Sequence, residues 1–372
     1  MDFSEFINEK IVASHAHHAW SAQVRTHRDL AYAKYYNNYQ SIEEAVTEDL
    51  KEELIFNQNR IKSLLKAYSS MRIDFLDREV FKLIPDFFME DYARIISKIS
   101  KQVIKNKDQP KNYEFLKEAD LFLHLLSKRK VKIEVPATTP KDIREYFNSF
   151  KPYINYNLFG TRTGRLTNEK GSLPILTLRK ENRKFIKPTN DYFAELDFNA
   201  CELRTLLGLN GIEQPQEDLH EWNNQNIFFG SLNRDEAKEK IFSWLYDEKI
   251  NKFADMYYNK DGIKQKYWDG LKVKNHFDRE ISCDSEHYAV NYIVQSTAMD
   301  LFFRQVLKIN ELLSETNSFI AFMVHDSVVL DLKKEDIQVL KKMIKSFSET
   351  EFGNFMVNVS IGTDFGNMRK AK

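Results

Sequence analysis

The stretch FMVHDSVVLDL, residues 322–332, has two apolar runs around a polar centre. Residues 322–324 and 328–330 are apolar, which is typical of two buried strands joined by a tight turn. The turn between them carries His325, Asp326 and Ser327. Packing gives no reason for a histidine and a carboxylate at the tip of a buried hairpin, so we treat this tip as a candidate functional site.

A second carboxylate stands at the end of another predicted strand. YFAELDFNACELRTLLGL, residues 192–209, begins as an apolar strand that ends near Asp197 and turns helical near Cys201. Two acids at neighbouring strand ends raise each other's pKa unless a cation lies between them. Oxygen ligands suit Mg²⁺, and two such ions ~3.5–4 Å apart serve phosphoryl transfer. Two unrelated turn or capping aspartates remain the alternative on this pattern alone.

A stripe of four side chains is expected between these acids in sequence. In RDEAKEKIFSWLYD, residues 234–247, Arg234, Lys238, Phe242 and Tyr246 recur every four residues. On a helix each such step drifts by ~40°, so they form one slowly winding stripe. Two cations followed by two aromatic rings suit a triphosphate and a base. A surface helix with solvated charges and two buried rings explains the same spacing.

The composition gives only broad limits on the partners and the cellular compartment of the protein. The 372 residues contain 55 Lys and Arg against 55 Asp and Glu, a balance that neither predicts nor excludes a polyanionic partner. Two cysteines suggest no disulfide framework. No apolar run has the ~18 residues of a membrane span, and the first residues do not resemble a secretion signal. We expect a cytoplasmic protein.

The order of expected elements indicates an α+β fold with a helical region in front. Residues 1 to about 130 show helical periodicity, and VPATTPKD, residues 135–142, reads as a linker. Residues 213–285 are expected to form helices with polar connections, and residues 286–313 one long helix. The remainder alternates strands with one amphipathic helix over residues 335–351.

Six segments in this order resemble the family A DNA polymerases, the group of bacterial DNA polymerase I and many phage replicases. The similarity covers residues 155–372 and includes DFNACELR (motif A), RDEAKEKIFSWLY (motif B) and MVHDS (motif C), together with FGTRTGRLT, EDLHEW and EHYAVNYIVQSTAMDLF. The resemblance implies a right-hand fold. We expect a helical thumb and N-terminal region in 1–150, an antiparallel-sheet palm in 151–212 and 286–372, and helical fingers in 213–285.

The resemblance also implies a template-directed DNA polymerase that extends a primer 3′-hydroxyl. Asp197, Asp326 and the Phe198 carbonyl would hold two Mg²⁺ ions, for which Mn²⁺ could substitute. One ion would activate the primer hydroxyl and the other would stabilise the leaving pyrophosphate. Lys238 would contact the phosphates and serve as general acid.

Further roles are implied on the nucleotide side. Arg234 and His220 would bind the phosphates of a dNTP, Phe242 would face its sugar, and Tyr246 would lie near the templating base. Glu202 would exclude ribonucleotides by its bulk beside the 2′ position.

Four residues are implied as contacts to primer–template DNA. Arg165, Asn291 and Gln295 would reach the minor groove, where acceptors at similar positions allow pair shape to be tested without reading sequence. His325 would touch the primer terminus. Arg204 and Arg183 are ordinary arginines or phosphate contacts, and the Lys-rich segment 98–112 is either a solvated face or a grip on duplex phosphates.

At three positions this sequence differs from the family motifs, and there the roles known for the family cannot be carried over. Ser327 follows Asp326 where the motif usually has Glu, so two aspartates should suffice as metal ligands. Asp247 stands in place of Gly, and His287 in place of an Arg that contacts DNA. No exonuclease-like segment is recognised, so we expect no 3′→5′ proofreading.

Three other readings stay open. A single-subunit RNA polymerase shares the fold and the aspartates, but a residue as large as Glu202 argues against it. An inactive DNA-binding subunit would not need both aspartates with Lys238 and Arg234, and a two-metal nuclease would not need the stripe. We expect a monomer without membrane contact, in a bacterial or phage-infected cell; a processivity or exonuclease partner is left open.

Overall fold

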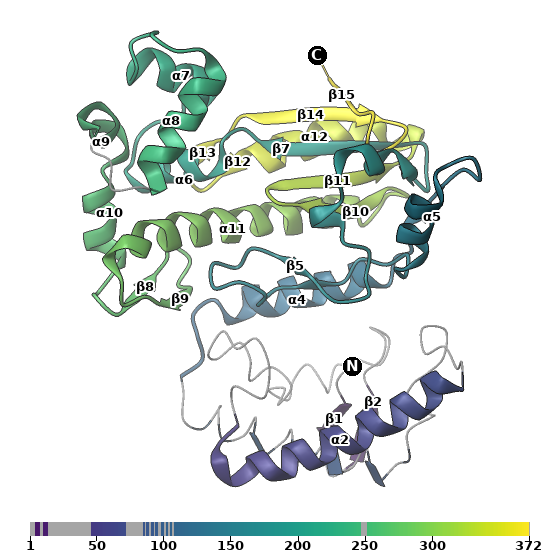
Figure 1. The fold of residues 1–372 in the computed structure, drawn as a ribbon. Coiled ribbons are helices and arrows are strands. Elements are labelled where there is room, and N and C mark those ends of the chain that lie inside the picture. The colour runs from purple at the N-terminus through teal and green to yellow at the C-terminus, as the bar shows by residue number, and fades with distance from the viewer. Residues whose placement is uncertain are drawn as a thin grey trace. The chain divides into compact units, whose positions relative to one another are not determined.

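The computed structural model describes residues 46–71, 108–246 and 251–371, the backbone of 4–7 and 10–13, and single positions between 85 and 105. The chain forms two compact units, residues 1–117 and 118–372 (Figure 1). Within the described residues, none of the helices has the length and apolarity that a membrane crossing requires. Residues 118–150, expected as part of the thumb region, belong to the second unit by their contacts.

The first unit contains the helix α2, Glu48–Ser70, and a strand pair, β1 (Ser4–Ile7) with β2 (Lys10–Ala13). Leu54 of α2 is buried with Ile95 and Ile99, and Ile61 is buried two turns further along the same face, so the apolar side of α2 faces the interior of this unit. The helical prediction is confirmed for α2. The strand pair was not predicted, because four-residue strands are too short to show a period.

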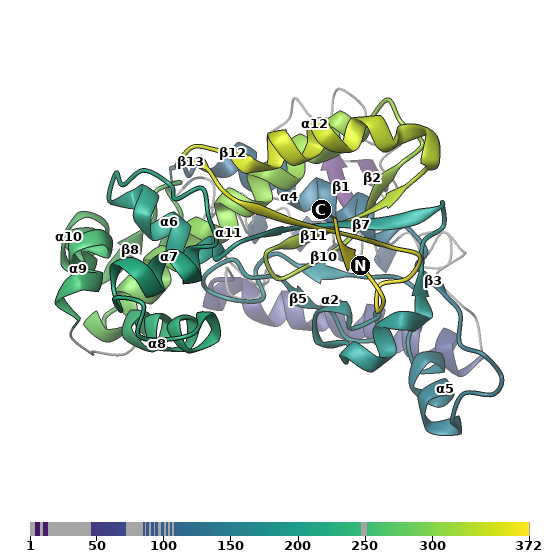
Figure 2. The same ribbon diagram turned by 90° about the horizontal axis from the view of Figure 1, so that it is seen from above.

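The second unit is built around a five-stranded antiparallel sheet in the order β10-β11-β7-β14-β15. These strands are β7 (Tyr192–Phe198), β10 (Phe319–Val324), β11 (Ser327–Leu332), β14 (Val357–Gly362) and β15 (Arg369–Lys370). The long helix α11, Glu286–Leu313, and α12, Ile337–Ser348, pack against each other and against this sheet (Figures 1 and 2). Mixed helices and antiparallel strands confirm the α+β class.

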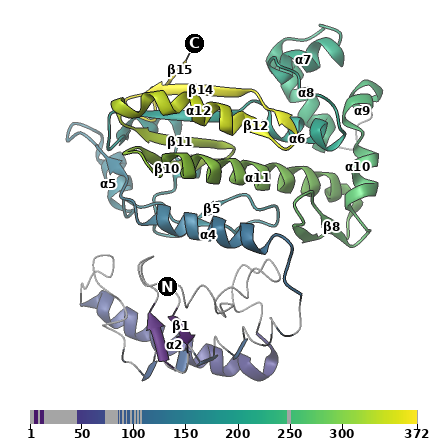
Figure 3. The same cartoon turned by 180° about the vertical axis from the view of Figure 1, so that it is seen from behind.

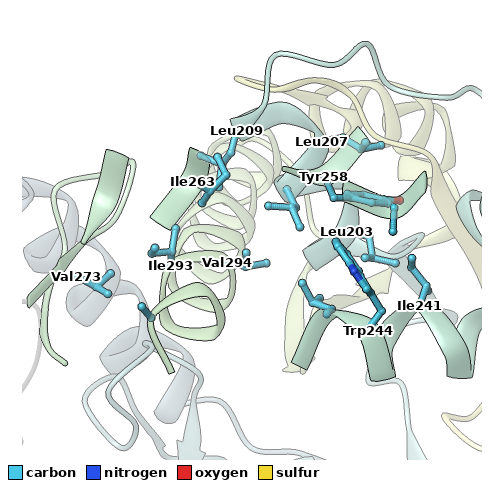
Figure 4. Packing of buried hydrophobic residues seen from close by; sticks show 14 of the residues in the cluster. Leu203, Leu207, Leu209, Ile241, Trp244, Tyr258, Ile263, Val273, Ile293 and Val294 are labelled. Carbon is cyan, nitrogen blue, oxygen red and sulfur yellow. The ribbon is translucent and has the colours of Figure 1, made fainter. Parts of the chain in front are cut away.

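A helical group lies at one end of α11 (Figures 1 and 3). It comprises α6 (Cys201–Leu209), α7 (Leu219–Asn226), α8 (Arg234–Tyr246), α9 (Lys252–Tyr258) and α10 (Lys260–Tyr267). One apolar cluster holds these helices to α11, with Leu203, Trp244, Tyr258 and Ile293 among its buried side chains (Figure 4). Burial of a Leu- or Ile-sized side chain stabilises a fold by about 1.5–3 kcal/mol, so this cluster fixes α6 and α8 relative to α11.

Residues 272–282 form a hairpin where helices were expected. Its strands are β8, Lys272–Lys274, and β9, Glu280–Ser282. Val273 and Ile281 are buried between exposed neighbours, and Asp278 adopts a positive φ of 63° in the turn. This is a half-buried strand pattern, too short to be recognised among helical segments.

The remaining elements are short. Those of the second unit are α4 (Tyr113–Ser127), β3 (Lys132–Ile133), α5 (Lys141–Asn148), β4 (Tyr156–Asn157), β5 (Thr167–Asn168), β6 (Ile186–Lys187), β12 (Glu349–Thr350) and β13 (Gly353–Asn354), with α4 beginning at the boundary of the two units. The expected linker 135–142 ends where α5 begins after Pro140. Asp247 lies outside the described residues.

Candidate active site

The hairpin tip lies beside the end of β7. β11 pairs with β7 so that Ser327 is opposite Asp197, and the turn residues His325 and Asp326 come directly before Ser327. His325 adopts a positive φ of 56°, which a tight two-residue hairpin turn requires. The prediction that the two acids stand at the ends of neighbouring strands is therefore confirmed.

Burial raises the pKa of both carboxyl groups, and repulsion from Asp326 adds to the shift of Asp197. Burial, followed by the charge of Asp326, raises the pKa of Asp197 to about 7, against a hydrogen bond from Asn358 Nδ2 at 3.2 Å and the charge of Lys238. Burial likewise raises the pKa of Asp326. Two partly desolvated carboxylates this close are stable together only when a cation or a proton compensates them. Their oxygen donors fit a divalent ion such as Mg²⁺.

A cavity of about 1110 Å³ opens over these aspartates. Twelve of the thirteen predicted site residues line it: Arg165, Asp197, Phe198, Glu202, His220, Arg234, Lys238, Phe242, Tyr246, Gln295, His325 and Asp326. They come from the loop before β5, from β7, α6, α7, α8 and α11, and from the β10–β11 turn, segments far apart in sequence. Sequence spacing had indicated two separate features, and the fold brings them to one place.

The stripe on α8 faces this cavity. Phe242 and Tyr246 stack with ring centroids 6.0 Å apart and planes 15° apart. Arg234 donates to Asp218 Oδ2 at 2.7 Å. Lys238 is exposed and, among the residues that the structure describes, makes no salt bridge, so its ammonium group is available to an anion.

Asp218 organises the side of the cavity that carries Arg234. It caps α7 by accepting hydrogen bonds from the backbone N–H groups of His220 and Glu221. Burial would raise the pKa of Asp218, but hydrogen bonds from Arg234 and from the backbone outweigh it and lower that pKa to about 2. The result is a fixed negative charge that holds Arg234 in place.

His220 is neutral at physiological pH. Its side chain is only 3% exposed, and burial lowers its pKa to about 4, with further lowering by the nearby cations Arg234 and Lys238. Its Nδ1 has no hydrogen-bond partner among the described residues. A buried imidazole nitrogen without a partner is ready to bond to a ligand atom.

Glu202 joins two sides of the cavity. Arg165 and Tyr246 both donate hydrogen bonds to its carboxylate. Burial raises the pKa of Glu202, whereas the Arg165 guanidinium lowers it. The side chain is therefore held by α8 on one side and by the 160–166 loop on the other.

The 160–166 loop packs against the buried side chain of Arg279 at Gly164. Gly164 has a φ of 80°, and a Cβ there would lie 2.9 Å from the guanidinium carbon of Arg279. Arg279 forms a fully buried ion pair with Asp300 of α11 at 2.5 Å. A larger residue at position 164 would therefore displace the loop that carries Arg165.

Three residues considered as contacts to phosphate or DNA, Arg204, Arg183 and Asn291, lie in different surroundings. Arg204 is fully buried and donates to three backbone carbonyls, those of Asn199, Pro215 and Glu217, so its interpretation as a phosphate contact is wrong. Arg183 does not line the cavity and stacks on Phe365. Asn291 lies on α11 outside the cavity lining, with a buried Oδ1 that has no partner among the described residues.

Two positions near the aspartates were not singled out from the sequence. Asn358 of β14 is opposite Asp197 and donates to it. Glu195 of β7 accepts a hydrogen bond from Ser327. A charged residue two positions before Asp197, inside an apolar strand, was the available signal for Glu195. No such signal existed for Asn358, because strand pairing is set by the fold.

The site is thus an acidic strand edge facing a helix with cationic and aromatic side chains. Residues 258–370 match the model described as DNA polymerase family A, which includes Asp326 but not Asp197 or α8. This part of the chain is similar to DNA polymerase family A.

Individual relatives show the same similarity. The chain is 25% identical over 268 residues to thermostable DNA polymerase I of Thermus aquaticus, covering 57% of this chain and 32% of that protein. It is 21% identical over 338 residues to DNA polymerase I of Borreliella burgdorferi, covering 74% and 37%. It is 31% identical over 107 residues to the DNA polymerase of Bacillus phage SP01, covering 25% and 12%. The chain thus spans about a third of the two DNA polymerase I relatives.

A solved structure also matches. The POL domain of Pol1 from M. smegmatis, in complex with DNA primer-template and dNTP, aligns with a TM-score of 0.49 at 14% identity. The alignment covers 85% of this chain and 66% of that one.

Proposed function

We propose that the protein is a template-directed DNA polymerase that adds deoxynucleotides to a primer 3′-hydroxyl. The similarity of residues 258–370 to DNA polymerase family A, and of longer stretches to two DNA polymerase I proteins, supports this. The observation that favours it most is one cavity in which Asp197 and Asp326 share the space with the Arg234–Tyr246 face of α8. An acidic strand edge alone would fit many metal-dependent hydrolases; the combination with α8 fits nucleotide transfer.

Asp197 and Asp326, with the Phe198 carbonyl, would hold two divalent ions, Mg²⁺ in the first place. Such ions lower the pKa of an attacking hydroxyl and neutralise charge on a leaving pyrophosphate. Three features support this assignment: the raised pKa values of the two carboxyls, their burial, and their position on one cavity wall. Within the described part of the chain no group of three His, Cys, Asp or Glu side chains could hold a metal, which suits a site with two acids.

The phosphate end of the nucleotide would lie along the first two turns of α8. Lys238 would bind the phosphates and donate a proton to the departing pyrophosphate. Arg234, held by Asp218, would bind from the side, and the free Nδ1 of neutral His220 would accept or donate one further hydrogen bond according to its tautomer.

The sugar and base would lie at the other end of the same helix. Phe242 would pack against the sugar, and Tyr246 would lie near the templating base. Glu202, fixed by Arg165 and Tyr246, would occupy the volume that a 2′-hydroxyl needs. This is the feature that favours dNTPs over rNTPs.

DNA contacts complete the proposal. Arg165 and Gln295 line the cavity and would reach the minor groove of the newly formed pairs, while His325 beside Asp326 would meet the primer terminus. Asn291 would join them if its buried Oδ1 found its partner in the DNA. The thumb (1–150), palm (151–212 and 286–372) and fingers (213–285) remain proposals, as do a cytoplasmic location and a monomeric state.

Extension of a 5′-labelled primer tests the function. With Mg²⁺ and dNTPs the protein should lengthen the primer according to the template, and chelation of the metal should stop it. Asp326→Asn should abolish extension, because the substitution removes a metal ligand at equal size. Unchanged extension by this variant contradicts the catalytic assignment.

The same assay separates the alternatives. Preference for rNTPs would indicate an RNA polymerase, and primer binding without extension an inactive DNA-binding subunit. Shortening of the primer without dNTPs would indicate a nuclease. We propose that none of these occurs and that the chain has no 3′→5′ exonuclease activity of its own.

A further inference from the structure

Glu195 lies on the same face of β7 as Asp197. Residues two apart on a strand project to the same side, and the register places Ser327 opposite Asp197 and Val329 opposite Glu195. Ser327 Oγ lies 2.9 Å from Glu195 Oε1, so the contact runs diagonally across the two strands. Ser327 is 4% exposed, which fixes this contact within the fold.

Packing does not account for an acid at position 195. Its chain neighbours Ala194 and Leu196 are fully buried on the other face of the sheet. In the described part of the chain no Lys, Arg or His forms a salt bridge with Glu195, although the side chain is half-buried and close to Asp197. A carboxylate beside that of Asp197 is unfavourable without a neighbouring cation.

We propose that Glu195 is a positioning residue of the metal-binding face: held by Ser327, it strengthens the binding of divalent ions by Asp197 and Asp326. This inference rests on the proposed function. Ser327 stands where the motif usually has Glu, and Glu195 places an acid on the neighbouring strand instead. The hydrogen bond of Glu195 is to Ser327, so we assign Glu195 a supporting role and not that of a direct ligand.

Ser327 supports the metal-binding face in two ways: it holds the carboxylate of Glu195, and it ties the turn with Asp326 to β7. Its hydroxyl lies within reach of Glu195 Oε1 and of the Val324 carbonyl at 3.0 Å, and its single proton can be donated to only one of them at a time. Donation to Glu195 fixes the carboxylate next to Asp197. Ser327 also follows Asp326 directly, so the same contact ties the turn that holds Asp326 to β7.

Mn²⁺ binding to the full chain, measured from the signal of free Mn²⁺ by electron paramagnetic resonance, tests this without catalysis. Removing a group that orients metal ligands typically weakens metal binding about 10–100-fold, and we expect the lower end, about tenfold, for Glu195→Gln. Ser327→Ala should weaken binding less, in the same direction. Glu181→Gln removes an exposed acid elsewhere in the second unit and should leave Mn²⁺ binding unchanged.

A double variant tests the placement of the acid. Glu195→Gln combined with Ser327→Glu returns one carboxylate to the position after Asp326 and should recover most of the lost affinity. The Mg²⁺ concentration for half-maximal primer extension should follow the same order, while KM for dNTP stays near that of the unaltered protein.

Mn²⁺ binding by Glu195→Gln equal to that of the unaltered protein would overturn the inference, as would an equal loss in Glu181→Gln. Thermal unfolding of each variant separates loss of the site from loss of the fold. If the unaltered protein extends no primer, the proposed function fails, whereas the Mn²⁺ comparison still decides whether Glu195 supports metal binding.

Discussion

Glu202 is the residue at which the wall of the cavity made by α8 meets the loop that carries Arg165. Both Arg165 and Tyr246 donate to its carboxylate, so its position depends on two separate elements. A side chain held on both sides cannot swing away from an extra hydroxyl on the nucleotide. Selection of the sugar should therefore depend on its size and on its two partners.

Glu202→Ala should admit ribonucleotides. A pocket that discriminates against one additional hydroxyl typically reaches about 10²-fold, so we expect the ratio of kcat/KM for rNTP to that for dNTP to rise by up to about that factor. Single-nucleotide incorporation on a primed template measures this ratio. Glu202→Gln keeps the bulk and should keep most of the discrimination; if Glu202→Ala discriminates as well as the unaltered protein, the assignment is wrong.

Asp197 makes the stability of the metal-free protein depend on pH. Its pKa is about 7 in the fold, where burial and Asp326 raise it, against an ordinary value of 3.8. The folded state therefore binds the proton more tightly than the unfolded chain. Its contribution to the free energy of unfolding is fully present below about pH 4 and is lost as pH rises toward 7.

Asp197→Asn should consequently stabilise the protein at pH 7.5 in the presence of a chelator. A gain of about 1 kcal/mol corresponds to roughly 2–4 °C in Tm for a unit of this size, and the gain should disappear near pH 4. Added Mg²⁺ should reverse the order, because a ligand of the folded state stabilises only the protein that binds it. Thermal unfolding at both pH values, with and without Mg²⁺, gives the comparison; a gain independent of pH contradicts the role of ionisation.

At the scale of elements, α6 and α7 are joined to the site by a buried polar chain. Arg204 of α6 donates to the carbonyl and side-chain oxygens of Asn199, whose amide donates to Asp218 at 2.8 Å. Asp218 in turn caps α7 and holds Arg234. The positions of α6 and α7 and the side chain of Arg234 are therefore coupled through hydrogen bonds rather than through apolar packing alone.

Arg204→Met should weaken both the fold and nucleotide binding. The variant has similar volume but leaves three carbonyls without their donor, and unsatisfied buried acceptors cost about 1–3 kcal/mol each. We expect a loss of about 3 kcal/mol, or roughly 6–12 °C in Tm, together with a higher KM for dNTP. Arg183→Met, which removes a half-buried guanidinium outside the cavity, should cost about 1 kcal/mol or less and leave KM unchanged.

Periodicity and motif order predicted much of this arrangement. The hairpin around Asp326, the strand-to-helix change after Asp197, and the helix over 286–313 follow directly from apolar spacing. Partners across strands do not, because spacing shows which face a residue occupies but not what lies opposite. Asn358 beside Asp197 and the contact of Glu195 with Ser327 depend on the sheet order β11-β7-β14, which no local pattern contains.

The sequence also did not predict which polar residues are buried. Arg204 and Arg183 look alike as isolated arginines, yet one is fully buried among carbonyls and the other stacks on an aromatic ring. Asn291 shares the helix of Gln295 but not its access to the cavity. The two residues are four apart and share one face of α11, so the difference is in position along the helix: the cavity is lined by Gln295 and Met299 but does not extend back to Asn291.

At the scale of the whole molecule, we expect the two units to have different binding roles. Every residue that lines the cavity lies between 150 and 358, within the second unit. The first unit contains α2 and the Lys-rich segment 98–112. We therefore expect nucleotide and metal binding to belong to the second unit, and part of the grip on duplex DNA to the first.

A fragment of residues 108–372, which keeps α4 whole, should test this division. It should unfold in one cooperative transition and bind Mn²⁺ as the full chain does, but bind primer–template DNA more weakly. Each lost phosphate contact lowers the slope of log K against log salt by about 0.9. A fragment with the affinity and salt dependence of the full chain would contradict a DNA-gripping role for the first unit.

Two lysines of the first unit offer a matched pair within the full chain. Lys98 is paired with Glu53 at 3.0 Å, so its charge is already compensated, whereas Lys105 is exposed. If the segment contacts duplex phosphates, Lys105→Gln should lower the salt slope by about 0.9 and Lys98→Gln by less, because a surface ion pair must first be broken to free Lys98. Titration of labelled duplex at several salt concentrations measures both slopes. Equal slopes in both variants and in the unaltered protein would mean that this segment is a solvated face, and that the DNA is held by the second unit alone.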